Sequence, residues 1–328
     1  MNRGLLRYIS RMTPRSDHPR TASAGLELEA LGAEDLLRAA LAEDLGDRGD
    51  ITSALALGGR GPRAVGRIMA KAEGRLSGVG LAGRTFTLVD DAVNVTLRQQ
   101  DGAAVHPADE VLIVEGPAAS LLEAERTAIN VLAHLSGVAS LTARYVAAVA
   151  GTRCRIVDTR KTTPGWRLLE KAAVKHGGGV NHRIGLYDEV LLKENHFTMA
   201  GGDHTAVVAS VKASAPQGTR ITAEARDVDE AWAEADGGAD VLLLDNFTIA
   251  HLAEAVARLK SHPRRAVFQL EASGGVNLDT VAAIAHTGVD RVSVGALTHS
   301  APALDLSMLL DELRPPGRGG PRLGGGRP

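Results

Sequence analysis

Positively charged side chains follow two short apolar segments in the middle of the chain. Arg155–Val157 precedes Asp158-Thr159-Arg160-Lys161, and Val190–Leu192 precedes Lys193-Glu194-Asn195-His196, with Asn181-His182-Arg183 between them. If the apolar segments are parallel strands, their carboxyl ends meet at one edge of a sheet, where α/β proteins keep their sites. The side chains gathered there predict a pocket for a small molecule with several negative charges: Arg160, Lys161, Arg183 and Lys193, with His182 beside them.

Three acidic residues follow apolar segments further along the chain. They are Glu224 after Ile221–Ala223, Asp245 after Val241–Leu244, and Glu271 after Val267–Leu270. Such carboxylates can cap the following helix, or they can bind hydroxyl groups and Mg²⁺, directly or through water. Opposite the cations, they favour a substrate that carries phosphates, hydroxyls and a metal ion.

Glycine turns close the last two predicted strands. Ser273-Gly274-Gly275 is one turn, and Gly295-Ala296-Leu297, after Arg291–Val294, is the other. Backbone amides freed by glycine cradle phosphate groups, and α/β barrels often place a phosphate site on their final loops. The two turns therefore predict a phosphate site.

A third glycine pattern, Gly78 to Gly83 with Asp101 beyond it, fits a dinucleotide fingerprint. The strand before it would contain Lys71, Glu73 and Arg75, whereas a Rossmann strand is buried on both faces. We therefore interpret these glycines as a tight turn with close packing.

The composition restricts the class of protein. The chain has 328 residues, 44% of them hydrophobic, which is ample for a core. A net charge of -2 and 3% aromatic residues argue against nucleic-acid binding. No run of 18 apolar residues occurs, so we expect no membrane span. Cys154 is the single cysteine, which excludes an internal disulfide and favours the reducing cytoplasm.

The chain divides into four predicted parts. We expect residues 1–25 to be a disordered leader or an over-extended start, and residues 314–328 to be a disordered tail. Half-polar strands within 63–116 predict a sheet with one wet face, after a helix from Leu26 to Leu45. A long helix from Leu121 to Val149 is expected to break near Ser136-Gly137.

From residue 155 onward, six apolar strands alternate with helices about 20 to 35 residues apart. This spacing is typical of repeated βα units and favours a barrel or a partial barrel. A doubly wound open sheet is the alternative. A barrel gathers all the strand ends into one mouth.

The ordered motifs together resemble one family, the quinolinate phosphoribosyltransferases, also called carboxylating nicotinate-nucleotide pyrophosphorylases. The resemblance runs from about Leu36 to Met308. Its most specific stretches are residues 125–130 (ERTAIN), 158–162 (DTRKT), 177–183 (GGGVNHR), 192–196 (LKENH), 244–247 (LDNF), 271–275 (EASGG) and 294–300 (VGALTHS). Small departures, such as Ser53 and Trp166, touch no charged position.

The resemblance implies an α/β fold, with an N-terminal α/β sandwich over residues 26–136 and an incomplete parallel (β/α) barrel over 137–299. Residues 300–313 would return to the first domain, with Leu304 to Leu313 as its C-terminal helices. The implied reaction joins quinolinate and phosphoribosyl pyrophosphate (PRPP), with Mg²⁺, into nicotinate mononucleotide, pyrophosphate and CO₂, as a step of de novo NAD biosynthesis.

The resemblance also implies roles for individual residues. The quinolinate pocket would be Arg126, Arg160, His182 and Arg183. Lys161 and Lys193 would lie between both substrates, and Glu224 and Asp245 would hold the ribose hydroxyls and Mg²⁺. The 5′-phosphate would bind Ser273, Gly274, Gly275, Gly295 and Ala296. The implied assembly is a homodimer in which Arg126 enters the partner's site.

Two other functions stay open from the sequence. A paralogue associated with molybdenum transport shares most motifs and would use another acceptor. A Schiff-base aldolase would use Lys161 or Lys193 as its nucleophile.

Overall fold

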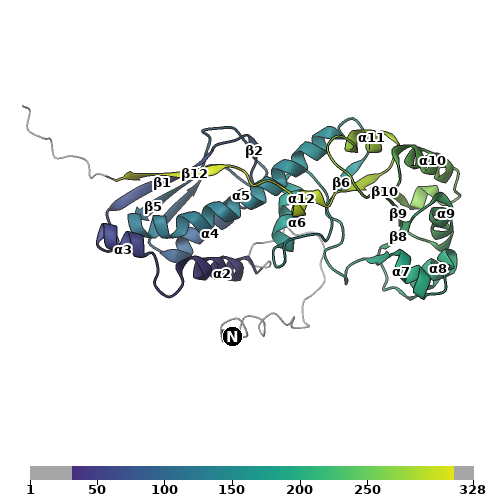
Figure 1. The fold of residues 1–328 in the computed structure, drawn as a ribbon, viewed down its shortest axis with the longest axis horizontal. Helices are drawn as coiled ribbons and strands as arrows, with labels where there is room; N and C mark the ends of the chain where they lie inside the picture. The colour runs from purple at the N-terminus through teal and green to yellow at the C-terminus, as the bar shows by residue number, and fades with distance from the viewer. Residues whose placement is uncertain (1–31, 314–328) are drawn as a thin grey trace, which may run out of the picture.

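The computed structural model describes residues 32–313 (Figure 1). The predictions for residues 1–25 and 314–328, and for the start of the first helix, lie outside this range. The described chain forms two layers of α/β structure side by side: an antiparallel sheet with its helices, and a parallel sheet with its own. This confirms the predicted α/β fold.

The antiparallel sheet has the strand order β12-β1-β5-β3. Its strands are β1 (Arg63–Ala70), β3 (Asn94–Leu97), β5 (Glu110–Pro117) and β12 (Leu306–Glu312). Helices α4 (Val79–Val89) and α5 (Ala118–Ala148) pack on it around a shared apolar cluster, and α2 (Ala33–Leu45) and α3 (Ile51–Leu57) lie against α5. The predicted N-terminal α/β sandwich is confirmed.

The last described segment returns to this sheet as a strand, so the prediction of helices from Leu304 to Leu313 was wrong. β12 pairs antiparallel with β1, Leu306 opposite Ala70 and Glu312 opposite Ala64. Leu306, Met308 and Leu310 are spaced by two residues and pack against the apolar cluster. This two-residue period is that of a strand with one buried face.

The glycines from Gly78 to Gly83 serve packing, as the sequence interpretation held. Gly78 takes a φ of 90° directly before α4, and a Cβ on Gly83 would lie 2.9 Å from the side chain of Val95. The carboxylate of Asp101 accepts the N–H of Val79 at 2.9 Å. The strand before the glycines, β2 (Gly74–Arg75), pairs antiparallel with β4 (Ala104–Val105). A Rossmann unit would need a parallel strand there.

Helix α5 is continuous over 31 residues, so the predicted break near Ser136-Gly137 was wrong. Gly137 is instead the crossing point of another segment, because a Cβ there would lie 2.2 Å from the carbonyl oxygen of Pro302. The Ser136 hydroxyl accepts the N–H of Ser77 at 3.0 Å. These two residues provide close packing and a hydrogen bond within a continuous helix.

Six parallel strands form the second sheet in the order β6-β11-β10-β9-β8-β7. They are β6 (Arg155–Val157), β7 (Val190–Leu192), β8 (Ile221–Ala225), β9 (Val241–Asp245), β10 (Gln269–Ser273) and β11 (Arg291–Ser293). The helices between and after them are α6 (Arg167–His176), α7 (Glu194–Met199), α8 (His204–Ser214), α9 (Val228–Gly237), α10 (Ile249–Leu259), α11 (Val281–His286) and α12 (Ala296–His299).

This order is that of a barrel with one seam open. Each strand from β7 to β11 pairs with the next, and β11 pairs with β6, but β6 and β7 remain the two edges of the sheet. The predicted incomplete barrel is therefore confirmed. A single parallel bridge between Val157 and Val180 continues the sheet into the open seam.

One strand lies later than predicted. β10 begins at Gln269, and Val267, which was expected to start it, is the last residue of a short 3-10 helix called η2 (Arg265–Val267). The expected strand ended at Leu270, whereas the real strand runs to Ser273. Glu271 is consequently the middle residue of the strand.

Candidate active site

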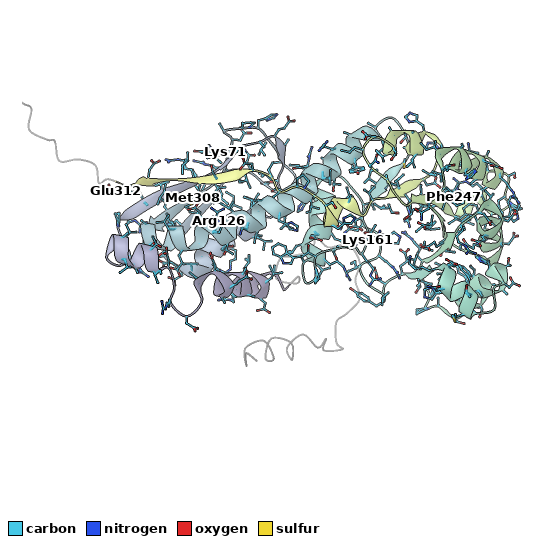
Figure 2. The ribbon with its side chains drawn as sticks, in the orientation of Figure 1. Lys71, Arg126, Lys161, Phe247, Met308 and Glu312 are labelled. Atoms are coloured by element: carbon cyan, nitrogen blue, oxygen red, sulfur yellow. The ribbon has the colours of Figure 1, made fainter. Side chains whose placement is uncertain are left out.

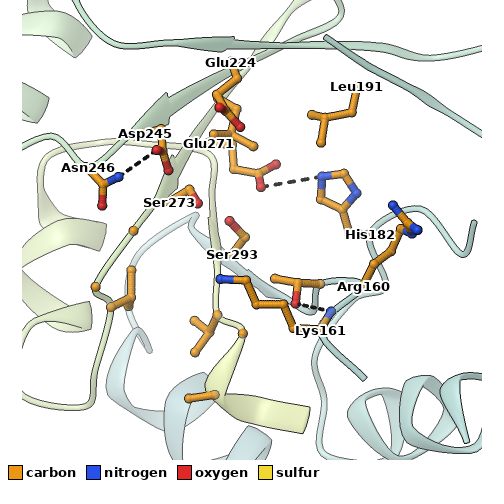
Figure 3. A pocket seen from close by; sticks show the side chains of 18 of the residues that line it. Arg160, Lys161, His182, Leu191, Glu224, Asp245, Asn246, Glu271, Ser273 and Ser293 are labelled. Atoms are coloured by element: carbon orange, nitrogen blue, oxygen red, sulfur yellow. Dashed lines mark hydrogen bonds and ion pairs between the residues drawn. The ribbon is translucent and has the colours of Figure 1, made fainter. Parts of the chain in front are cut away.

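A cavity of about 800 Å³ opens at the carboxyl ends of the barrel strands (Figure 3). It is lined by side chains from or next to all six strands. Thirteen of the residues that the sequence singled out lie on its wall: Arg160, Lys161, His182, Arg183, Lys193, Glu224, Asp245, Glu271, Ser273, Gly274, Gly275, Gly295 and Ala296.

One wall carries the arginines and Lys161. The backbone of Lys161 is held on both sides, since its N–H donates to Thr159 Oγ1 at 3.0 Å and its carbonyl accepts from Thr298 Oγ1 at 2.7 Å. Arg160 has a buried Nε without a hydrogen-bond partner. Burial and the nearby Arg160 both lower the pKa of Arg183. Free guanidinium donors and crowded cations make this wall suited to an anionic ligand.

His182 lies on the same wall as a neutral group. Burial, together with the positive charges of the neighbouring Arg291, Lys171 and Arg183, lowers its pKa to about 3. Its Nδ1 accepts the N–H of Arg183 at 2.7 Å, which leaves the proton on Nε2. That Nε2 lies 3.7 Å from Glu271 Oε1 (Figure 3). His182 therefore offers a ligand a neutral N–H donor.

The facing wall carries Glu224 and Asp245. Glu224 accepts from Lys193 Nζ at 2.8 Å, and Asp245 accepts from the side-chain amide of Asn246 at 2.7 Å. Neither caps a helix, because Asp227 caps α9 and Thr248 caps α10. The capping alternative is thus excluded for both carboxylates. Their oxygens remain available for hydroxyl groups or a hard cation.

Glu271 differs from its expected position at the mouth. It is fully buried, forms an ion pair with Arg291, and its Oε1 has no hydrogen-bond partner. Burial raises its pKa. The reason is the later start of β10, which places Glu271 within the strand. It contributes to the cavity wall without an exposed carboxylate.

Two glycine turns complete the cavity, one beside Asp245 and one beside Lys161. Gly274 takes a φ of 96°, and a Cβ there would lie 2.1 Å from Asn246 Oδ1 and 2.9 Å from the Asn246 backbone nitrogen. Gly274 is therefore required for the close approach of two loops. A Cβ on Gly295 would lie 3.1 Å from both Lys161 Cδ and His299 Nε2.

Comparison with known proteins matches the chain along most of its length. The family model "Quinolinate phosphoribosyl transferase, N-terminal domain" matches residues 50–136, and the corresponding C-terminal domain model matches residues 138–309. The chain belongs to the quinolinate phosphoribosyltransferase family.

Relatives agree with this assignment. The chain is 40% identical over 278 residues to the carboxylating nicotinate-nucleotide pyrophosphorylase of Mycobacterium leprae, covering 84% of this chain and 96% of that protein. It is 38% identical to a probable enzyme of the same name from Bacillus subtilis, covering 85% and 93%. The crystal structure of NadC from Streptococcus pyogenes superimposes with a TM-score of 0.81 at 37% identity, covering 89% of this chain and all of that one.

The structure leaves Arg126 apart from the other residues that the family resemblance named. It is exposed on α5, over the antiparallel half of the molecule, whereas Lys161 lies at the barrel (Figure 2). The cavity wall of this chain does not include it.

Sequence reasoning missed four polar residues of the cavity wall: Thr159, Asn246, Ser293 and His299. Thr159 and Asn246 stand next to residues that were named, Ser293 lies inside the predicted strand Arg291–Val294, and His299 belongs to the VGALTHS stretch quoted for the family. The signal for His299 was its position on the turn four residues after Gly295, which a short helix brings back to the cavity.

Among residues 32–313, no group of three His, Cys, Asp or Glu side chains could hold a metal ion alone. No helix in that range is long and apolar enough to cross a membrane.

Proposed function

We propose that this enzyme transfers the phosphoribosyl group of PRPP to quinolinate, with loss of CO₂, giving nicotinate mononucleotide and pyrophosphate for NAD biosynthesis. One observation carries the proposal. A single cavity places guanidinium groups and a neutral histidine on one wall and carboxylates on the other, with glycine turns beside Asp245 and Lys161. Quinolinate needs the first set, and PRPP needs the second.

The acceptor would bind at Arg160, His182 and Arg183. Quinolinate carries two carboxylates on adjacent ring carbons, and two guanidinium groups with an N–H donor match two carboxylates in number and charge. The neutral state of His182 suits this role, because it can donate from Nε2 without adding a third buried positive charge.

The donor would bind along Glu224, Asp245 and the glycine turns. Glu224 and Asp245 would accept from the ribose hydroxyls. The backbone amides near Ser273-Gly274-Gly275 and Gly295-Ala296 would take the 5′-phosphate.

The same two carboxylates fit Mg²⁺. This cation is commonly held by one or two carboxylates together with substrate phosphates, and Asp245 keeps one carboxylate oxygen clear of its bond to Asn246. When bound, Mg²⁺ would neutralise charge on the pyrophosphate group.

Catalysis by the chain's own residues is mostly electrostatic. Lys161 and Lys193 would lie against the departing pyrophosphate and offset its growing charge. As the ribose C1–O bond breaks, the pyridine nitrogen forms a bond to C1 and becomes cationic. That positive nitrogen stabilises the electron pair left on ring carbon C2 when CO₂ departs, and a proton from solvent completes the product. No general base is required.

The direct test is an assay of purified protein with quinolinate and PRPP, following nicotinate mononucleotide by chromatography. We expect turnover with quinolinate and little with nicotinate, which has a single carboxylate. Chelation by EDTA should abolish turnover, and added Mg²⁺ should restore it. Equal use of nicotinate and quinolinate would contradict the acceptor assignment, and activity unaffected by EDTA would contradict the metal.

We also propose a homodimer in which Arg126 of one subunit completes the acceptor pocket of the other. The support is the distance of Arg126 from its own cavity, together with the family resemblance of residues 125–130. Arg126→Ala and Lys161→Ala should each be nearly inactive. Refolded together, they form mixed dimers in which one site carries both changes and the other carries neither. Roughly a quarter of the wild-type activity should return. No recovery would place Arg126 in its own chain's site or in none.

The alternatives predict different chemistry. An aldolase would need a lysine nitrogen free to attack a carbonyl carbon, whereas Lys193 Nζ is hydrogen-bonded to the carboxylate of Glu224 at 2.8 Å. Borohydride trapping of a carbonyl substrate on Lys161 or Lys193 would support that alternative. A paralogue with another acceptor would bind PRPP but leave quinolinate unconsumed. We further propose a cytoplasmic location, since Cys154 is a free thiol; cell fractionation tests this.

A further inference from the structure

The open seam of the barrel separates the proposed acceptor-binding residues, because Arg160 lies on one side of it and His182 and Arg183 lie in the segment that enters it. β6 and β7 are the two edges of the parallel sheet, so no ladder of backbone hydrogen bonds joins them. Arg160 and Lys161 follow β6, while His182 and Arg183 come from the irregular segment that enters the seam. That segment contacts β6 through one bridge, between Val157 and Val180.

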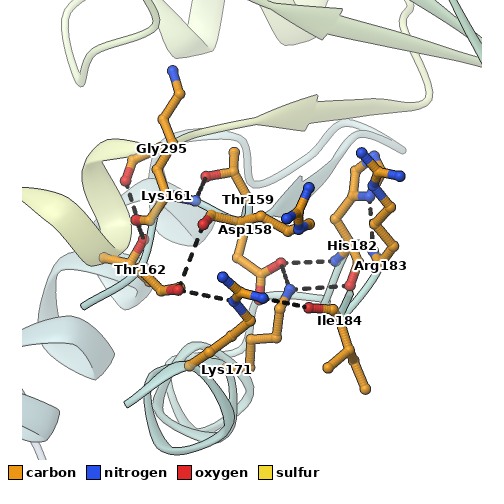
Figure 4. Close-up of polar contacts among 12 residues, drawn as sticks. Asp158, Thr159, Lys161, Thr162, Lys171, His182, Arg183, Ile184 and Gly295 are labelled. Atoms are coloured by element: carbon orange, nitrogen blue, oxygen red, sulfur yellow. Dashed lines mark hydrogen bonds and ion pairs between the residues drawn. The ribbon is translucent and has the colours of Figure 1, made fainter. Parts of the chain in front are cut away.

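Beyond this bridge, a buried ion pair joins Lys171 of α6 to Asp158, the residue after β6 (Figure 4). Lys171 Nζ lies 2.5 Å from Asp158 Oδ1 and also donates to the carbonyl oxygen of His182 at 3.0 Å. The same Asp158 oxygen accepts the N–H of His182 at 2.8 Å. Asn181, with its amide oriented to suit its neighbours, donates to Asp158 Oδ2 and to the Lys171 carbonyl, both at 2.9 Å.

A second connection lies on the same helix. Arg167 donates to Thr162 Oγ1 at 3.0 Å and to the carbonyl oxygen of Ile184 at 3.2 Å (Figure 4). Together with Glu170, which accepts the N–H of Thr163 at 3.1 Å, helix α6 thus binds the loop after β6 and the seam segment, residues 180–184, at three points each. The anion-binding side chains lie between these points.

The ion pair is a costly source of stability. Both side chains have 0% exposure. Burial lowers the pKa of Lys171 and raises the pKa of Asp158 to about 6, against the attraction between the two charges. Buried ion pairs are often no more stabilising than apolar residues of similar volume. What this pair provides is geometry, because it bonds both backbone polar groups of His182.

We propose that Asp158 and Lys171 are positioning residues that fix the spacing of Arg160, His182 and Arg183 across the open seam, and thereby set the affinity for the acceptor's two carboxylates. The identity of the acceptor rests on the proposed function. Neither side chain lines the cavity, so both act through the backbone of His182.

The test is the double variant Asp158→Asn, Lys171→Met, which removes both buried charges and keeps side-chain size. We expect the KM for quinolinate to rise roughly 10- to 100-fold, the effect of displacing a binding group by about 1 Å. The KM for PRPP should stay within about twofold. Amide hydrogen exchange across residues 180–184 should become faster.

A second variant covers the case in which the double variant does not fold. Arg167→Met removes another connection of α6, made from a partly exposed position, and it should also raise the quinolinate KM. The matched control is Lys212→Met, which breaks the Lys212–Asp240 pair, 2.6 Å long, at the opposite end of the strands. It should change neither KM.

Three results would overturn the inference: unchanged amide exchange, an equal rise of both KM values, or faster exchange with unchanged quinolinate KM. Failure of the wild-type protein to use quinolinate would count against the proposed function alone, because the exchange measurement tests the connection without a substrate.

Discussion

The two walls of the cavity are held in place by different means. Glu224 and Asp245 lie on β8 and β9, which are inner strands with a hydrogen-bonded neighbour on each side. Arg160, His182 and Arg183 lie on segments beyond β6 and inside the open seam. On the first wall, strand register sets side-chain positions. On the second wall, side-chain hydrogen bonds from α6 do so.

This difference determines how strongly each wall responds to a single substitution. Register along a ladder is shared among many backbone bonds, so one substitution displaces a strand side chain little. A segment held by two or three side chains loses its position when one of them changes. We therefore expect acceptor binding to be sensitive to buried residues far from the substrate, and donor binding to depend on groups that touch it.

The largest effect should come from the cationic wall itself. Arg183→Ala should weaken quinolinate binding by about 2–5 kcal/mol, because one carboxylate loses a charge-assisted partner in a partly buried site. Isothermal titration with quinolinate measures this. Arg265→Ala, which removes an arginine paired with Asp290 at the other end of the barrel, is the control. Equal losses of quinolinate affinity in both variants would mean that the cationic wall does not bind quinolinate.

Asp245→Asn should act on the other substrate. We expect kcat/KM for PRPP to fall roughly 100- to 1,000-fold, as when one preorganised electrostatic group is lost, with quinolinate binding preserved. Asp240→Asn changes the residue just before the same strand, at its opposite end, and should leave PRPP kinetics intact. A fall in quinolinate affinity in Asp245→Asn would mean that the two walls are not separable.

The stability of the fold should depend on pH through His182 on the cationic wall. The pKa of His182 is about 3 in the fold and 6.5 in the reference state, so the unfolded chain binds the extra proton between these values. Stability from this source is complete above pH 6.5 and falls as the pH drops, by about 2 kcal/mol at pH 5.

Urea unfolding of wild type and His182→Asn at pH 7.5 and pH 5 measures this effect. Asp158 works in the opposite direction, since its pKa is raised from 3.8 to about 6, so only the difference between the two proteins isolates His182. If the difference in unfolding free energy between wild type and His182→Asn is the same at both pH values, His182 is charged in the fold at pH 5.

The smallest effect should come from Gly274→Ala. Its positive φ costs about 1–2 kcal/mol of stability for a residue with a Cβ, and the contact with Asn246 should shift the partner of Asp245, raising the KM for PRPP several-fold. Gly218→Ala has a φ of 83° and open space around its Cβ, so it supplies the strain without the contact. Identical KM values for PRPP in both variants would mean that the contact between Gly274 and Asn246 does not affect PRPP binding.

The sequence predicted the cavity better than it predicted the segments around it. Polar residues after apolar strands lie together because parallel strands share one edge, and that rule needs no tertiary detail. The position of Glu271 was wrong because the apolar pair Val267-Phe268 resembles a strand start, whereas Val267 ends a 3-10 helix and β10 begins at Gln269. Ser136-Gly137 resembled a helix break because the crossing of Pro302 over Gly137 cannot be seen in a single sequence. The Asp158–Lys171 pair needed the fold to bring its partners together.

Helix α5 has a consequence for how the protein unfolds. Its first half contributes Leu121, Ala128 and Leu132 to the apolar cluster of the antiparallel sheet, and its second half contributes Val138 and Tyr145 to that of the barrel. Helix formation is cooperative along its length, so melting one cluster removes support from the other. The return of β12 to β1 adds a second covalent link between them. Despite its two large sheets, the protein should therefore lose its structure in one calorimetric transition.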